Sequence, residues 1–153
     1  MSRQIRPAEA ADAPFLSAIA RDAKASWGYS EEWLDAWAPQ LTISPSYIKR
    51  HLVLVFLEHG IALGFVSLES LLDTGEVGHL WVHPGHQGRG IGNHLMAAVL
   101  DRTRQAGCRE LLVLSDPNAV GFYEKHGAIQ VGEEDAPVLG EDRVLPRLSI
   151  PLE

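Results

Sequence analysis

The stretch HLWVHPGHQGRGIGNHL, residues 79–95, decides the fold. Its opening residues are apolar and aromatic, and they predict a strand that ends at Val82 or His83. A glycine-rich loop follows, and helical spacing begins at once with Ile91. Glycines let a backbone approach a ligand closely, and the first N–H groups of a helix are unpaired at its positive end. The stretch therefore predicts an anion-binding turn that suits a pyrophosphate.

Two helices are predicted near the start of the chain. Asp12 is expected to cap the first helix, and Ser30 to cap a second, acidic helix with Leu34 and Trp37 on its apolar side. The inward face of the first helix is predicted to consist of Phe15, Leu16, Ile19 and Ala20.

Strands and helices alternate in the rest of the chain. Strand-like runs over residues 52–58, 61–72 and 76–82 predict an antiparallel meander. A helix over 91–106 is expected to bury Ile91, Leu95, Met96, Val99 and Leu100. A strand over 110–116, a short helix from Pro117 to Gly127, and strands over 128–134 and 144–150 complete the order. Pro146 is expected at an edge or a bulge. This order predicts a single α+β domain over residues 1–153.

Composition disfavours several classes of partner. The net charge is −7 and the basic residues are scattered, so no nucleic acid is expected. No membrane is expected either, since no run of about 18 apolar residues exists and the first residues lack the apolar core of a signal peptide. Cys108 is the only cysteine, which excludes an internal disulfide. A cytoplasmic location is therefore expected.

The glycine loop matches one of three phosphate-binding patterns. It lacks the Gly-Lys-Ser/Thr ending of the P-loop. The dinucleotide fingerprint needs glycine where Asn93 stands, and a βαβ unit that opens the domain, so NAD is disfavoured. The remaining pattern, QGRGIG at residues 87–92, resembles the Q/R-x-x-G-x-G/A loop of the GNAT acetyltransferases, whose backbone amides bind the pyrophosphate of coenzyme A.

A second stretch, DPNAVGFYEKHGA at residues 116–128, extends this resemblance. It is similar to the family's later motif, in which an asparagine contacts the pantetheine arm and a tyrosine lies near the coenzyme A sulfur. Asn118 and Tyr123 match those two positions, whereas Ala128 stands where the family has phenylalanine. From the residues alone, Asn118 could equally cap the helix and Tyr123 could be a core aromatic.

The resemblance implies a GNAT-like fold, with a central, mostly antiparallel mixed sheet flanked by helices. It implies an N-acetyltransferase that moves the acetyl group of acetyl-CoA to a primary amine by direct attack in a ternary complex. In such an enzyme a backbone N–H, here that of Val82, stabilises the oxyanion and Tyr123 protonates the leaving thiolate. A homodimer is compatible with the sequence. The implied coenzyme A contacts are Leu80, Trp81, Val82, Gln87, Gly88, Arg89, Gly90, Ile91, Gly92, Asn118 and Tyr123.

A general base is expected, because an amine with a pKa of about 10.4 is almost fully protonated at pH 7. Glu76 is the favoured candidate, because its position counted back from the glycine loop matches that of the catalytic glutamate in one branch of the family. His79 has a suitable unperturbed pKa of about 6.5, but it needs a strand bulge to reach the same face. Either residue could also be an ordinary exposed strand side chain.

The acceptor pocket implied by the family architecture contains Trp27, Tyr29, Trp33 and Glu69. Trp33 and Trp37 are four residues apart and also fit a core. No metal is expected, because the histidines near the loop have no acidic or cysteine ligand beside them. A rival interpretation is a non-catalytic acyl-CoA sensor that keeps the loop and lacks the chemistry.

Overall fold

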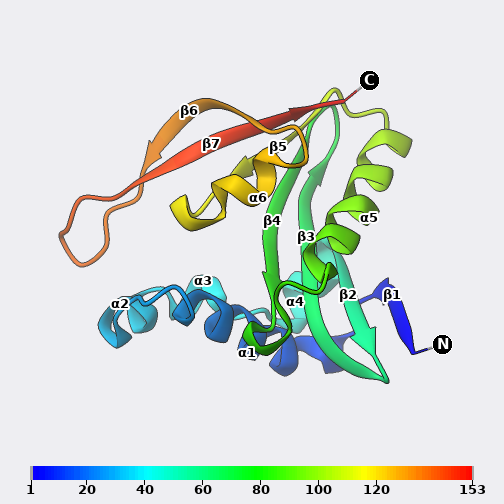
Figure 1. The fold of residues 1–153 in the computed structure, drawn as a ribbon, viewed down its shortest axis with the longest axis horizontal. Coiled ribbons are helices and arrows are strands. Elements are labelled where there is room, and N and C mark those ends of the chain that lie inside the picture. Colours follow the sequence, from blue (N-terminus) through cyan, green and yellow to red (C-terminus); the bar gives the residue numbers. More distant parts are fainter. Residues whose placement is uncertain (1, 153) are drawn as a thin grey trace. The chain divides into compact units, whose positions relative to one another are not determined.

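The computed structural model describes residues 2–152, and within them seven strands form one mixed sheet in the order β1-β2-β3-β4-β5-β7-β6 (Figure 1). The strands are β1 (Arg3–Pro7), β2 (Leu52–Glu58), β3 (Ile61–Leu71), β4 (Gly75–Val82), β5 (Glu110–Leu114), β6 (Ile129–Asp135) and β7 (Val144–Pro151). The α-helices are α1 (Ala13–Ala25), α2 (Glu31–Ala36), α3 (Ala38–Leu41), α4 (Pro45–Arg50), α5 (Ile91–Gln105) and α6 (Val120–Glu124). Three short 3-10 helices are η1 (Ala10–Asp12), η2 (Pro84–His86) and η3 (Pro117–Ala119). The predicted α+β architecture, a mixed sheet flanked by helices, is confirmed.

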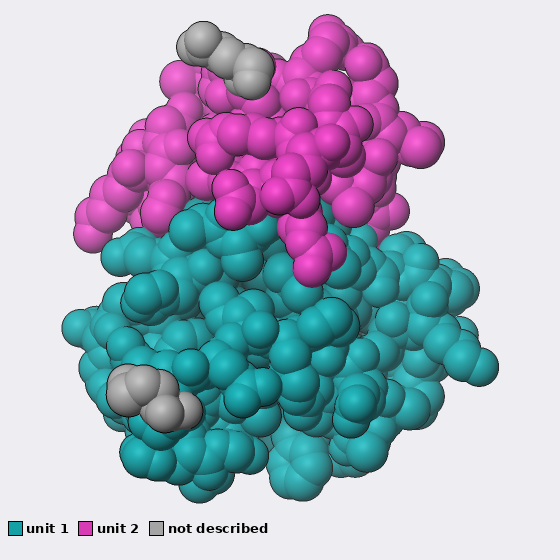
Figure 2. Space-filling model, turned by 90° about the vertical axis from the view of Figure 1, so that its right-hand side faces the viewer, with its two compact units in different colours: residues 1–68, 78–99 teal, residues 69–77, 100–153 magenta. Residues whose placement is uncertain are grey.

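The chain forms two compact units (Figure 2). The first comprises residues 2–68 and 78–99, and the second comprises residues 69–77 and 100–152. Three elements, β3, β4 and α5, each contribute residues to both units. A single domain over residues 1–153 stays a prediction.

The first unit is built on β2 and β3, which pair in antiparallel register. All residues from 53 to 57 are buried, because side chains on both faces of β2 are covered. On one face lies a core of Ala13, Leu16, Ile19, Ala20, Leu41, Ile43, Ile48, Val53, Val55, Leu57 and Phe65. On the other face Gly64 lies against Ile91 and Leu95 of α5. The strand run is therefore apolar from residue 52 to residue 57 rather than alternating.

Two expectations for α1 are corrected by the structure. Phe15 is 63% exposed, because its position is about 100° around the helix from Leu16, which is fully buried. Asp12 precedes α1 as predicted, yet its carboxylate does not cap that helix. It accepts the backbone N–H of Glu9 at 2.7 Å and pairs with Arg6 at 2.8 Å. The hydrogen bond from Arg6 is the main reason why the pKa of Asp12 is lowered.

Ser30 and the helix after the glycine loop agree with the predictions. The Ser30 hydroxyl accepts the backbone N–H of Trp33 at 3.2 Å and so caps α2. The five predicted core residues of α5 are all buried. No helix in the described part of the chain is both long and apolar enough to cross a membrane.

The second unit is built on β5, β6 and β7, with β5 parallel to the first residues of β4. β7 lies between β5 and β6, so Pro146 is neither on an edge strand nor at the register shift, which falls in β6. Ser115 donates its N–H to the Pro146 carbonyl at 2.9 Å. Proline cannot return that bond, and the ladder between β5 and β7 therefore ends there.

Candidate active site

The glycine loop lies between β4 and α5, as the sequence predicts. Gly88 and Gly90 have positive φ angles of 79° and 83°, which favour glycine over residues with a Cβ. The carbonyl of Gly90 accepts the N–H of His94 at 3.0 Å. That bond begins the helical ladder, so the N–H groups of residues 91 and 92 have no acceptor within the helix. The local geometry is that of an anion-binding helix start.

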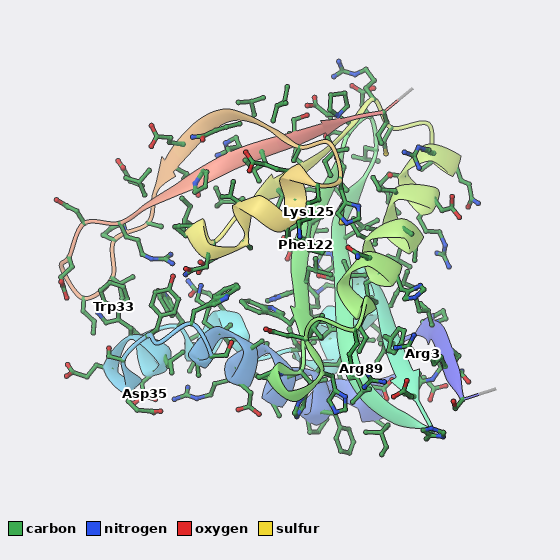
Figure 3. All side chains as sticks on the ribbon, viewed as in Figure 1. Arg3, Trp33, Asp35, Arg89, Phe122 and Lys125 are labelled. Carbon is green, nitrogen blue, oxygen red and sulfur yellow. The ribbon has the colours of Figure 1, made fainter. Side chains whose placement is uncertain are left out.

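Arg89 is engaged by a carboxylate outside the loop. Its guanidinium donates to both carboxylate oxygens of Glu58, at 2.8 and 3.1 Å, and also contacts His86 Nδ1 at 2.6 Å. Arg3 binds the same carboxylate at 2.8 Å, and Figure 3 labels both arginines. Hydrogen bonds from these two arginines lower the pKa of Glu58, and the bond from Arg89 is the larger cause. In this structure the charge of Arg89 is thus held at the end of β2.

Asn118 and Tyr123 both belong to the second unit. Asn118 does not cap the short helix; Asp116 does, by accepting the backbone N–H of Asn118 at 2.8 Å. The same carboxylate accepts the Asn118 amide at 3.0 Å and pairs with the almost buried Arg143 at 3.0 Å. Tyr123 is 5% exposed, and burial raises the pKa of its hydroxyl. Its ring meets that of Phe122, labelled in Figure 3, edge to face at 5.2 Å.

The two candidate bases lie in different surroundings. Glu76 is exposed and stands opposite Leu112 in the short parallel ladder of the second unit. His79 is half-buried in the first unit, with its ring 5.6 Å from that of Tyr47 and 5.9 Å from that of Phe65. Trp81 Nε1 donates a hydrogen bond of 2.9 Å to His79 Nδ1.

The bond from Trp81 determines the tautomer of His79. An indole N–H only donates, so Nδ1 must be the unprotonated ring nitrogen, and in the neutral ring the proton sits on Nε2. A base must accept a proton on an unprotonated nitrogen. His79 could therefore act as a base only by giving up the hydrogen bond from Trp81.

Five partly exposed aromatic side chains form what we call the aromatic cluster. It consists of Trp27, Tyr29, Trp33, Trp37 and Trp81, which include all four tryptophans of the chain. Tyr29 stacks on Trp33 at 6.0 Å and meets Trp37 at 4.9 Å, while Trp27 meets Trp81 at 5.8 Å. The ring contacts form two groups, one of three rings and one of two, and the cluster is joined by the ammonium of Lys24, which is within 6 Å of rings in both. Three of the predicted acceptor residues belong to these two groups. Glu69 belongs to the second unit, where it is exposed on β3.

The ammonium of Lys24 lies within the aromatic cluster. Its Nζ is 4.3 Å from the ring centre of Trp37, 5.3 Å from that of Tyr29 and 5.8 Å from that of Trp81. Sequence reasoning missed Lys24, because its contacts come from separate elements. It also missed the hydrogen bond of 2.8 Å between Tyr47 and the buried Ser67, although a lone hydroxyl within the apolar run of β3 was a signal.

Metal ligands do not gather in residues 2–152: no group of three or more His, Cys, Asp or Glu side chains there could hold an ion. The rings of His83 and His86 are 5.2 Å apart. Both Nδ1 atoms are occupied, that of His83 by the N–H of Gly85 at 3.1 Å and that of His86 by Arg89.

Comparisons with known proteins agree with this geometry. A model of the acetyltransferase (GNAT) family matches residues 15–128. The fold is similar to a GCN5-related N-acetyltransferase of Rhodopseudomonas palustris, with a TM-score of 0.83 and 26% identity over 99% of this chain and 97% of that one. It is also similar to the PaiA N-acetyltransferase of Thermoplasma acidophilum in complex with coenzyme A, with a TM-score of 0.80 and 23% identity over 99% and 100% of the two chains.

A curated relative is the amino-acid acetyltransferase of Neisseria meningitidis, 30% identical over 86% of this chain and 28% of that protein. The chain spans half or less of the length of the curated relatives it matches.

Proposed function

Because the chain belongs to the acetyltransferase (GNAT) family, we propose that it transfers the acetyl group of acetyl-CoA to a primary amine. The observation that carries the proposal is the turn at Gly88 and Gly90, whose positive φ angles lead directly into the start of α5. Backbone amides at this turn offer partial positive charge to a pyrophosphate. A relative of similar fold was solved in complex with coenzyme A, which supports the same co-substrate here.

The chemistry we propose is direct attack of the neutral amine on the thioester carbonyl. The nitrogen forms a bond to carbon, the carbonyl oxygen gains negative charge, and the backbone N–H of Val82 stabilises that oxyanion. Collapse of the tetrahedral intermediate expels the thiolate. Tyr123 donates its proton to sulfur, and the proton that the attacking nitrogen loses as the amide forms returns to the Tyr123 phenolate through water. Burial raises the pKa of Tyr123, so its hydroxyl starts the reaction protonated at neutral pH.

Glu76 is the base that we propose for the acceptor amine. It is an exposed carboxylate, whereas the unprotonated nitrogen of His79 is occupied by Trp81. A carboxylate removes an ammonium proton directly or through water. His79 remains the alternative base, but it would have to lose the hydrogen bond from Trp81.

The acceptor, location and assembly are further proposals. The amino-acid acetyltransferase relative makes an amino acid one acceptor to test. A cytoplasmic location agrees with the single, buried thiol of Cys108. A homodimer is the assembly that we propose to test by light scattering.

A screen of acceptors tests the proposed function. Purified protein, acetyl-CoA and a panel of amines, amino acids and peptides are mixed, and release of the free thiol is followed with a thiol reagent. We expect release that depends on one class of amine and an N-acetyl product in the mass spectrum. Acetyl-CoA binding by calorimetry without thiol release for any acceptor would support the sensor instead. Absence of binding would refute both.

A further inference from the structure

The aromatic cluster is organised around a positive charge. Cation–π attraction operates when a cation lies within about 6 Å of a ring centre, and Lys24 Nζ meets that condition at Trp37, Tyr29 and Trp81. Its distance from Trp37, 4.3 Å, is the shortest of the three. A group of electron-rich faces that holds an internal ammonium has the chemistry to hold an external one.

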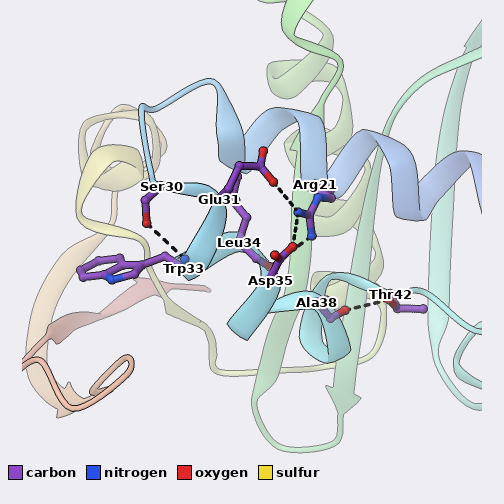
Figure 4. Close-up of polar contacts among 8 residues, drawn as sticks. All are labelled: Arg21, Ser30, Glu31, Trp33, Leu34, Asp35, Ala38 and Thr42. Atoms are coloured by element: carbon purple, nitrogen blue, oxygen red, sulfur yellow. Dashed lines mark hydrogen bonds and ion pairs between the residues drawn. The ribbon is translucent and has the colours of Figure 1, made fainter.

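The charge around the cluster favours the same ligand. Helix α2, which supplies Trp33, has the sequence EEWLDA, with three acidic residues and no basic one. Figure 4 shows the indole of Trp33 extending away from the ion pairs that Arg21 makes with Glu31 and Asp35. The net charge of the chain, −7, adds to this field. Because Arg21 pairs with two of the three carboxylates of α2, Glu32 and the net charge of the chain provide a small preference for a cationic ligand over an anionic one.

We infer that the aromatic cluster binds a cationic group of the acceptor, and that Lys24 occupies this site as a tethered competitor in the free protein. The inference depends on the proposed acetyl transfer in one respect, which is that the bound cation belongs to the acceptor. Partly exposed side chains line the site, and the concentration of all four tryptophans there gives it large, rigid contact surfaces.

The bound cation is not the nitrogen that is acetylated. Cation–π contact stabilises the protonated form, and a protonated amine has no lone pair with which to attack a thioester. The substrate class is therefore an amine that carries a second positive charge, such as a diamine or an amine with a quaternary ammonium group. That second charge stays in the cluster throughout the reaction.

Tryptophan fluorescence tests the site without any turnover, because every tryptophan of the chain belongs to the cluster. The probe is tetramethylammonium chloride, with sodium chloride at equal ionic strength and neutral tert-butanol as controls. We expect a saturable change with tetramethylammonium alone. Lys24→Ala removes the competitor and should tighten the apparent Kd by roughly three-fold to ten-fold, since a tethered group acts at an effective concentration in the millimolar range. Lys24→Arg keeps the charge and should bind like the wild type.

Trp37→Leu removes the nearest ring and should weaken binding by roughly two-fold to five-fold. Circular dichroism establishes that each variant is folded. The inference is overturned if folded wild type and folded Lys24→Ala both fail to respond to tetramethylammonium, or respond equally to tert-butanol. Should Lys24→Ala not fold, the wild-type and Trp37→Leu titrations decide alone.

Acceptor kinetics separate this inference from the proposed function. 1,4-Diaminobutane should have a kcat/KM at least ten-fold above that of n-butylamine, which lacks the second charge. Equal values for the two amines would leave acetyl transfer in place and overturn the cationic acceptor. Cation binding without transfer to any amine would refute the proposed function and leave the cation site standing.

Discussion

Replacing Gly64 by alanine should destabilise the protein and weaken acetyl-CoA binding together. A Cβ at this position would lie 3.0 Å from the carbonyl oxygen of Trp81 and 3.2 Å from both Ile91 Cγ2 and Leu95 Cδ1. A backbone carbonyl cannot move cheaply, so β4 or the first turn of α5 must shift. Overpacking of this kind costs about 1–3 kcal/mol, which for a chain of this size lowers Tm by roughly 2–12 °C.

The loss of affinity follows from the position of Ile91, the first residue of α5 after the glycine loop. A displaced helix start moves the N–H groups proposed to bind pyrophosphate. We expect a three-fold to ten-fold weaker Kd, about 0.7–1.4 kcal/mol, measured by calorimetry with acetyl-CoA. Gly132→Ala is the matched control, since the nearest atoms to a Cβ there, which belong to the side chain of Arg147, are 4.0 Å away. A Gly64→Ala protein with wild-type Tm and affinity would refute the steric reasoning.

Four further substitutions test the site and one ion pair. Gly90→Asp adds bulk and negative charge at a positive φ, so calorimetry should detect no acetyl-CoA binding, and unchanged affinity in the folded variant would remove the central proposal. Tyr123→Phe should lower kcat by roughly ten-fold to a thousand-fold with little change in the KM of acetyl-CoA, whereas an unchanged kcat would leave Tyr123 as a core aromatic. Glu76→Gln should lower kcat/KM by roughly a hundred-fold and recover partly at high pH; full activity there, with loss in His79→Ala, would move the base to His79. The lowered pKa of Asp12 contributes stability that is present above its unfolded pKa of about 3.9 and is lost as the pH falls through the folded value. Asp12→Asn should therefore flatten this part of the acid unfolding curve, and an unchanged curve would contradict the assignment.

Local chemistry explains why the loop and α5 could be predicted. The glycines, the helix start at Ile91 and the buried stripe of α5 depend on neighbouring residues in the chain, which a sequence displays directly. Ser30 likewise caps α2 by accepting an N–H from a residue only three positions ahead in the chain. The family resemblance added the mixed sheet, which no local pattern specifies.

What was missed depends on side-chain orientations and tertiary packing, even where the two partners are only two or six residues apart in the chain. Asp12 has the sequence of a helix cap, but the guanidinium of Arg6 from β1 takes its carboxylate. Phe15 belongs to an apolar stripe whose centre is fixed only by what α1 packs against. The hydrogen bond from Trp81 to His79 reverses the apparent suitability of the histidine as a base, and nothing in the local sequence indicates the ring orientations.

Glu58 bridges Arg3 and Arg89, and this sharing has a consequence for how readily the loop arginine can be recruited. If a partly shielded carboxylate loses its only ion-pair partner, its charge is left unpaired, which is unfavourable. Here Arg3 would keep Glu58 neutralised if Arg89 turned toward a diphosphate. Arg3 of the first strand thus remains the counterion of Glu58, so Arg89 can bind a new partner without leaving that carboxylate unpaired.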